Sequence, residues 1–118
     1  IIPSTPTRFR AYQLGTPGSS FSYFAGAHFT LIEARVTEKS HPSLMEELAL
    51  CGKTSIDTLH ITSWDQDHCA VADLQWILIN LTPTRIEYPG YLPHTDTGGT
   101  CLEAIRSYRR NQAALTRK

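Results

Sequence analysis

Apolar side chains alternate with polar ones over the first third of the chain, which is the period of half-buried β-strands. The alternation runs through residues 8–14, 21–25 and 28–36, with glycine-containing stretches between these segments. The stretch 15–20 predicts a plain hairpin loop rather than a phosphate cradle, because no Gly-Lys-Ser/Thr sequence follows it. Its glycines permit positive φ or a close backbone approach. We therefore predict an antiparallel meander of three strands.

In the rest of the chain, segments with helix start and stop signals alternate with short apolar runs. Proline near the first turn, early glutamates and a terminal glycine mark one helix, with Leu44, Leu48 and Cys51 on one face. Thr100 and Glu103 form a capping box that predicts the start of a basic final helix. The expected elements are helices at 40–52, 70–81 and 100–115 and strands at 56–61 and 85–88. This order predicts an α/β (α+β) fold, in which a β-meander is followed by alternating helices and strands.

Two carboxylates and an imidazole follow the predicted strand at 56–61 directly. Asp65, Asp67 and His68 lie within four positions, and the carboxyl edge of a sheet is where open α/β folds place their sites. Carboxylate and imidazole together suit zinc, manganese or iron. The same cluster is also compatible with an ordinary N-cap of the following helix, since Asp favours helix starts.

The stretch Ser63-Trp-Asp-Gln-Asp-His68 resembles the metal-binding signature of the metallo-β-lactamase superfamily, His-x-His-x-Asp-His. It is similar to the variant His-x-Asp-x-Asp-His of the ComEC-type DNA-uptake competence proteins, where a strand beginning Ile-Asp-x-Leu also precedes the motif. Ile56-Asp-Thr-Leu59 stands at that place here. The resemblance implies that Asp65, Asp67 and His68 are metal ligands and that Asp67 helps to hold or orient the attacking water as the catalytic residue.

Two residues depart from the pattern of the family. Ser63 stands where the family usually has His, and a serine hydroxyl is a poor zinc ligand, so the first metal site is degenerate and Ser63 is left with a supporting role. The family has an Asp that buttresses the metal-site loop at the end of an earlier strand, and Glu33 holds that place. Glu33 either supports the metal ligands from behind or is an outward-facing glutamate on a strand.

The resemblance covers roughly residues 8 to 110 and implies the N-terminal half of an αββα sandwich. We accordingly expect residues 1–118 to form a single (half-)domain of a longer chain. It implies a metal-dependent hydrolase, of the phosphodiesterase or nuclease type, with one zinc or manganese ion and a nucleic acid or other phosphodiester substrate. The missing second half, or another subunit, is an expected partner. The alternative is a catalytically inactive module of this fold that binds a partner or scaffolds an assembly.

Composition sets outer limits on these functions. The chain has 118 residues, with 11 basic and 11 acidic side chains and a formal net charge of zero, so no overall positive field argues for nucleic acid. No apolar run approaches the ~20 residues of a membrane span, and we expect no membrane segment in this chain. The cysteines Cys51, Cys69 and Cys101 form no Cys-x-x-Cys pair, which favours buried free thiols and a reducing, cytoplasmic location.

The last predicted helix carries three arginines on one face. Arg106, Arg109 and Arg110 stand at i, i+3 and i+4, while Leu102 and Ile105 form the packed side. Cations also suit a helix C-terminus, which gives a purely structural explanation for them and for Arg117 and Lys118. If the protein acts on nucleic acid, these arginines are the best phosphate contacts in the sequence.

Overall fold

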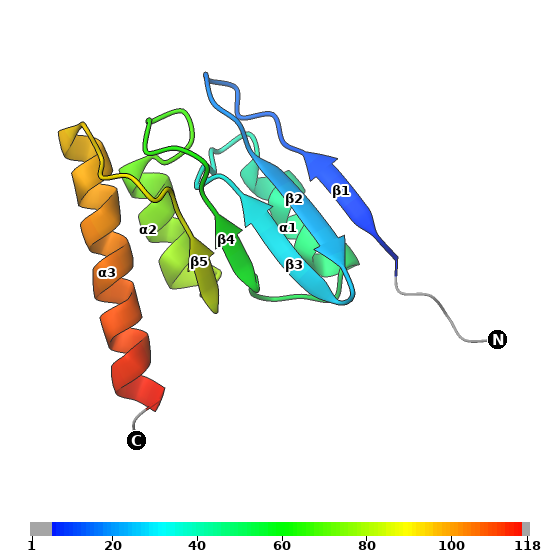
Figure 1. Cartoon of the computed structure of the whole chain (residues 1–118). Coiled ribbons are helices and arrows are strands. Elements are labelled where there is room, and N and C mark those ends of the chain that lie inside the picture. The colour runs from blue at the N-terminus through cyan, green and yellow to red at the C-terminus, as the bar shows by residue number, and fades with distance from the viewer. Residues whose placement is uncertain (1–5, 117–118) are drawn as a thin grey trace.

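The computed structural model of the protein describes residues 6–116. These residues form a mixed α+β fold with a five-stranded sheet of order β1-β2-β3-β4-β5 and three helices (Figure 1). The strands are β1 (Arg8–Ala11), β2 (Phe21–Ala25), β3 (His28–Ile32), β4 (Thr58–His60) and β5 (Arg85–Glu87). The helices are α1 (His41–Leu50), α2 (Val71–Asn80) and α3 (Asp96–Thr116). The predicted order of elements is confirmed.

Strands β1, β2 and β3 form the predicted antiparallel meander, with Phe9 opposite Tyr23 and Tyr23 opposite Thr30. Gly26 and Ala27 join β2 to β3 with φ values of 57° and 63°, the two positive φ angles that a tight hairpin turn requires. The predicted strand at 28–36 is too long, because Glu33 turns out of β3 with a φ of 76°. Beyond it, Ala34 makes only an isolated parallel bridge to Cys69.

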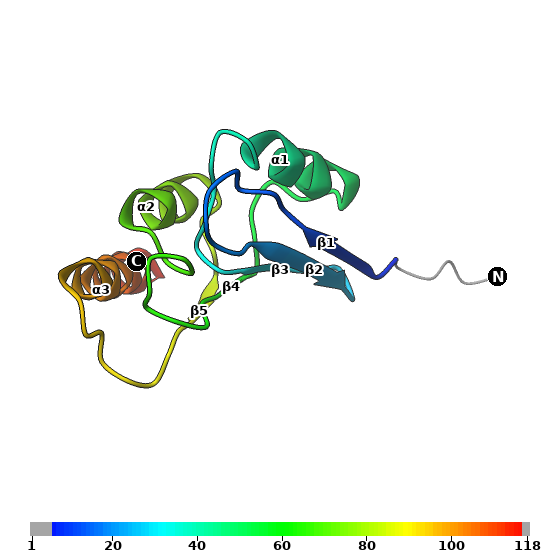
Figure 2. The same ribbon diagram turned by 90° about the horizontal axis from the view of Figure 1, so that it is seen from above.

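Strands β3, β4 and β5 are parallel to one another, so their carboxyl ends lie at one edge of the sheet. The connections run through α1 and α2, which cover the same face, and α3 packs against α2 beyond β5 (Figure 2). The core lies between this face and the helices. Its fully buried side chains include Phe29, Leu31, Leu44, Leu48, Leu59, Leu74, Ile77 and Ile105.

One local prediction for the helices is wrong. Helix α3 begins at Asp96 rather than Thr100: the Thr95 hydroxyl accepts a hydrogen bond from the Gly98 amide at 3.1 Å, while the Thr100 hydroxyl donates to the Asp96 carbonyl. Glu47 of α1 is buried: its side chain is only 1% exposed and binds Arg8 and Arg10 of β1. A local cap by Thr95 decides where α3 begins, whereas the burial of Glu47 depends on tertiary partners in β1.

The opposite face of the sheet carries no helix of residues 6–116 (Figure 2). Phe9 and Tyr23 are 64% and 45% exposed there, and the Phe9 ring stacks on Phe21 at 5.8 Å between centroids. Among residues 6–116, no helix has both the length and the apolar character needed to span a membrane.

Candidate metal site at the carboxyl edge of the sheet

Three segments meet where the parallel strands end. Glu33 follows β3, the stretch 61–70 follows β4, and the stretch 88–95 follows β5. We call the stretch 61–70 the edge loop. All of the sequence-predicted ligands lie on the edge loop, while Glu33 reaches it from the neighbouring strand.

Glu33 lies beneath the edge loop and is only 3% exposed, so the outward-facing alternative is wrong. One carboxylate oxygen accepts a hydrogen bond from the Thr62 amide at 2.8 Å, and the other accepts one from the Thr62 hydroxyl at 2.6 Å. The second oxygen also contacts Nδ1 of His68. Because Glu33 has a positive φ, its side chain leaves the alternation of β3 and lies under this loop. A residue with extended backbone at this position would continue that alternation.

His68 is oriented by this contact. A carboxylate only accepts hydrogen bonds, so a neutral His68 carries its proton on Nδ1 and leaves the lone pair on Nε2. The side chain is 32% exposed, and within residues 6–116 no hydrogen bond to Nε2 is present. His68 therefore offers a directed, accessible nitrogen at the carboxyl edge of the sheet.

Asp65, Asp67 and Ser63 shape the turn that presents His68. The Asp65 carbonyl accepts hydrogen bonds from the amides of His68 and Cys69, while the Ser63 hydroxyl accepts one from the Asp65 amide at 3.1 Å. Asp65 and Asp67 are exposed. Helix α2 has Ala70 as its N-cap, without a side-chain cap, so the alternative of an N-cap cluster is wrong.

The structure does not gather the predicted ligands into a complete shell. Within the described part of the chain, no group of three or more His, Cys, Asp or Glu side chains is arranged to hold a metal ion. Glu33 and His68 come together, whereas Asp65 and Asp67 lie on the same turn with their carboxylates in solvent.

Arg35 fastens the edge loop from inside, a role that sequence reasoning missed. Its guanidinium is almost buried and donates to the carbonyls of Pro17, Gln66 and Asp67 and to the Asp73 carboxylate. Burial of a charge is tolerated only with such partners. The sequence signal is slight: a lone arginine within an apolar stretch.

Gly18 makes this packing possible. The Ser19 amide donates to the Asp67 carbonyl at 3.2 Å, which brings the loop after β1 against the edge loop. A Cβ atom at position 18 would collide with the Arg35 guanidinium and the Asp67 carbonyl. The expected need for a close backbone approach in the 15–20 turn is thus confirmed at Gly18.

The two thiols next to the site lie in the core. Cys69 and Cys101 are fully buried, and the Cys101 thiol donates to the Cys69 carbonyl at 3.6 Å. The neighbouring Cys101 thiol, together with burial, raises the pKa of Cys69. All three cysteines are free, with Cys51 half-buried. The prediction of small buried hydrophobes without a disulfide framework holds for Cys69 and Cys101.

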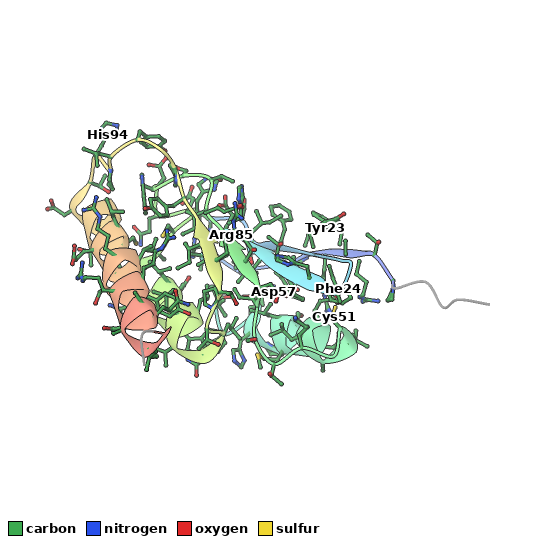
Figure 3. The ribbon with its side chains drawn as sticks, turned by 60° about the horizontal axis from the view of Figure 1, so that its bottom comes forward. Tyr23, Phe24, Cys51, Asp57, Arg85 and His94 are labelled. Atoms are coloured by element: carbon green, nitrogen blue, oxygen red, sulfur yellow. The ribbon has the colours of Figure 1, made fainter. Side chains whose placement is uncertain are left out.

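A pocket of about 370 Å³ opens beside the edge loop and is lined by Trp64, Asp65, Tyr91, His94 and Thr95. His94 lies at the tip of the stretch between β5 and α3 (Figure 3). From its sequence, this proline-rich stretch predicts a surface loop rather than a set of ligands. Its position after a parallel strand, together with its aromatic residues, is the signal that would have placed it at the same edge as Asp65.

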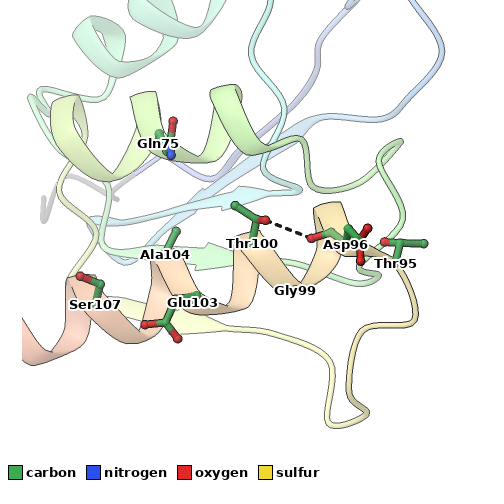
Figure 4. A pocket seen from close by; sticks show the side chains of 8 residues that line it. All are labelled: Gln75, Thr95, Asp96, Gly99, Thr100, Glu103, Ala104 and Ser107. Atoms are coloured by element: carbon green, nitrogen blue, oxygen red, sulfur yellow. Dashed lines mark hydrogen bonds between the residues drawn. The ribbon is translucent and has the colours of Figure 1, made fainter.

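A second hollow, a broad groove of about 670 Å³, follows the solvent side of α2 and α3 (Figure 4). Gln75, Asp96, Glu103 and Ser107 line it, and the Thr100 hydroxyl donates to the Asp96 carbonyl at the end where α3 begins. No histidine or cysteine is among its lining residues. It offers polar surface without the constellation that a nucleophilic or metal site needs.

The predicted nucleic-acid contacts lie away from this edge. Arg106, Arg109 and Arg110 are exposed on α3, and Arg110 pairs with Glu103 at 3.0 Å. Arg109 is 13 residues beyond Asp96, the first residue of α3. At a rise of 1.5 Å per residue, Arg109 lies about 20 Å along the helix axis from Asp96. Arg117 and Lys118 lie outside the described residues.

Neither a scan against protein-family models nor comparisons with the curated proteins and with the solved structures find a match to this chain. The function proposed below therefore depends on the residues of the edge loop and their neighbours.

Proposed function

We propose that the chain is part of a metal-dependent hydrolase of the metallo-β-lactamase type that acts on phosphodiesters and has a degenerate first metal site. The observation that carries the proposal is the contact between Nδ1 of His68 and the buried Glu33 carboxylate. Metal-binding histidines usually donate their second ring N–H to such a group, which fixes the ring and makes the ligating nitrogen more basic.

The residues fit an ion in part. His68 would hold it through Nε2, and Asp67 and Asp65 on the same turn would supply oxygen, a donor set that suits zinc or manganese. Fewer than three of these groups are gathered within residues 6–116. The chain alone would therefore bind an ion weakly and leave positions for water, substrate or ligands from another segment or subunit.

Each residue of the edge would have a distinct task in hydrolysis. When bound, the ion supplies Lewis acidity toward a phosphoryl oxygen. Glu33 holds the His68 ring, and Arg35 holds the carbonyls of Gln66 and Asp67. The exposed Asp67 carboxylate, directly before His68, would orient the attacking water and accept its proton.

The finer fold assignment belongs to the same proposal. A meander, two crossover helices and a ligand loop after the fourth strand are what the N-terminal half of an αββα sandwich would have. The exposed rings of Phe9 and Tyr23 on the helix-free face support a second layer there. The other half of the sandwich, or another subunit, would supply it.

A second candidate function is a catalytically inactive module of this fold that binds a partner or scaffolds an assembly. It is favoured by Ser63, whose hydroxyl caps the Asp65 amide and takes the place of a ligand. The incomplete shell within residues 6–116 favours it as well.

Hydrolysis of bis(p-nitrophenyl) phosphate in zinc or manganese tests the proposal. We expect slow, chelator-sensitive turnover that His68→Ala abolishes and that the control His41→Ala keeps, since His41 is exposed at the start of α1. Turnover that is equal in both variants would contradict the proposed site. Metal binding without turnover would favour the inactive module.

A further inference from the structure

We propose that Cys69 and Cys101 are an oxidisable pair, which forms a disulfide by exchange with a low-molecular-weight disulfide. Cys69 lies on the edge loop directly before α2, and Cys101 lies in the second turn of α3. The new bond would join the edge loop to α3 covalently. The inference goes beyond the proposed function, because it involves neither a metal ion nor hydrolysis.

The two thiols meet in the core, although they are 32 positions apart in sequence. The Cys101 thiol donates to the Cys69 carbonyl at 3.6 Å, and both side chains are 0% exposed. The Cys101 thiol raises the pKa of Cys69 more than burial does, which places the two side chains next to each other. Such contact is the first condition for a disulfide, because cysteines whose side chains point apart cannot be bridged without backbone movement.

The exchange balances in two steps, with oxidised glutathione as the small disulfide. One of the two thiols loses its proton and attacks a glutathione sulfur, so that a mixed disulfide forms and one glutathione leaves. The second thiol loses its proton and attacks the protein sulfur of this mixed disulfide, and the other glutathione leaves. The two protons go to the departing thiolates. Two protein thiols are thereby oxidised, and one small disulfide is reduced to two thiols.

The bond would strengthen a junction that now depends on packing and hydrogen bonds. Helix α3 is attached through its buried side chains and through the Tyr108 hydroxyl, which donates to the Pro83 carbonyl at 2.7 Å. A cross-link over 32 positions removes conformations from the unfolded chain and so stabilises the fold. Because Cys69 directly follows His68, the same bond would anchor the base of the edge loop.

Mass spectrometry of the full chain after incubation with oxidised glutathione tests the proposal. We expect a product that is lighter than the reduced chain by two hydrogen atoms, with a cross-linked peptide that contains Cys69 and Cys101. The half-buried Cys51 should gain a mixed disulfide instead, and Cys51→Ala should leave the cross-link unchanged. Cys69→Ala and Cys101→Ala should each abolish it. The cross-link should raise Tm by about 5 °C or more, and dithiothreitol should reverse the rise.

Three results would overturn the inference, and each can be obtained with the wild-type chain alone. The first is a native chain in which Cys51 reacts while Cys69 and Cys101 stay reduced. The second is a cross-link that forms only in urea, since it would belong to the unfolded chain. The third is a cross-link that lowers Tm, because the native core would then have to distort to accept it. None of these measurements uses a metal ion, so their failure leaves the proposed function untouched.

Discussion

The Glu33 carboxylate contacts Nδ1 of His68, although 35 residues separate the two in sequence. Glu33 is 3% exposed and His68 presents its other face to solvent. The pair joins the end of β3 to the loop after β4. It decides which nitrogen of His68 is free, and most of the functional account follows from it.

Replacing Glu33 by Gln should reverse the His68 tautomer. The amide oxygen of Gln would keep the hydrogen bond from the Thr62 amide, and its NH2 group would then donate to Nδ1. The imidazole proton would move to Nε2, which could no longer bind an ion. Long-range nitrogen-15 NMR of the ring reports the tautomer directly. Glu87→Gln, opposite His60 on β5, is the matched control and should alter His60 alone.

Ser63→His should tighten zinc binding. A second imidazole on the edge loop, close to Asp65, would add another donor to a loop that presents its carboxylates to solvent. Calorimetry checks this against Thr54→His, which adds a histidine at an exposed position remote from the edge loop. Equal affinities in the two variants would mean that residue 63 points away from the ion.

Glu47 makes the stability of the fold depend on pH. Hydrogen bonds from Arg8 and Arg10 hold the pKa of Glu47 below its ordinary value, with Arg8 contributing most. A lowered folded-state pKa adds stability above the unfolded pKa of about 4.3. That stability is lost as the pH falls through the folded value. Urea unfolding from pH 7 to pH 3 should show the difference between wild type and Glu47→Gln shrinking in acid. Parallel curves would contradict the ion pair.

Arg106, Arg109 and Arg110 remain the predicted nucleic-acid contacts. If they bind phosphates, replacing all three with Ala should flatten the salt dependence of oligonucleotide binding by about 0.9 units of logarithmic slope per lost contact. Fluorescence anisotropy on single-stranded and duplex oligonucleotides measures this, with the exposed Lys39→Ala as control. An unchanged slope in the triple variant would remove α3 from the binding surface and favour the non-enzymatic alternative.

The order of elements followed from the sequence because each depends on a local period. Alternation marked β2 from Phe21 to Ala25, and helical punctuation marked α1 and α2 to within a few residues. The burial of charged side chains cannot be predicted from such local periods. Glu47 and Arg35 are charged positions whose burial depends on partners from distant segments, Arg8 in one case and Asp73 in the other.

The location of the candidate site could be predicted from the sequence, but the contacts between its side chains could not. A run of Asp65, Asp67 and His68 after a buried strand indicates the carboxyl edge of a sheet, and the edge loop is there. The contact between Glu33 and His68 depends on the positive φ of Glu33, which ends β3. A glutamate within an apolar run does not by itself predict a positive φ. The neighbourhood of His94 depends on the packing of Trp64 against Tyr91, a contact between two loops.

Zinc and manganese calorimetry on the wild type and on the double variant Asp67→Ala, His68→Ala tests the central claim most directly. We predict weak binding by the wild type at the His68 site and its loss in the double variant, because the nitrogen oriented by Glu33 and its neighbouring carboxylate are then both absent. Metal binding that is unchanged by the double substitution would contradict the account.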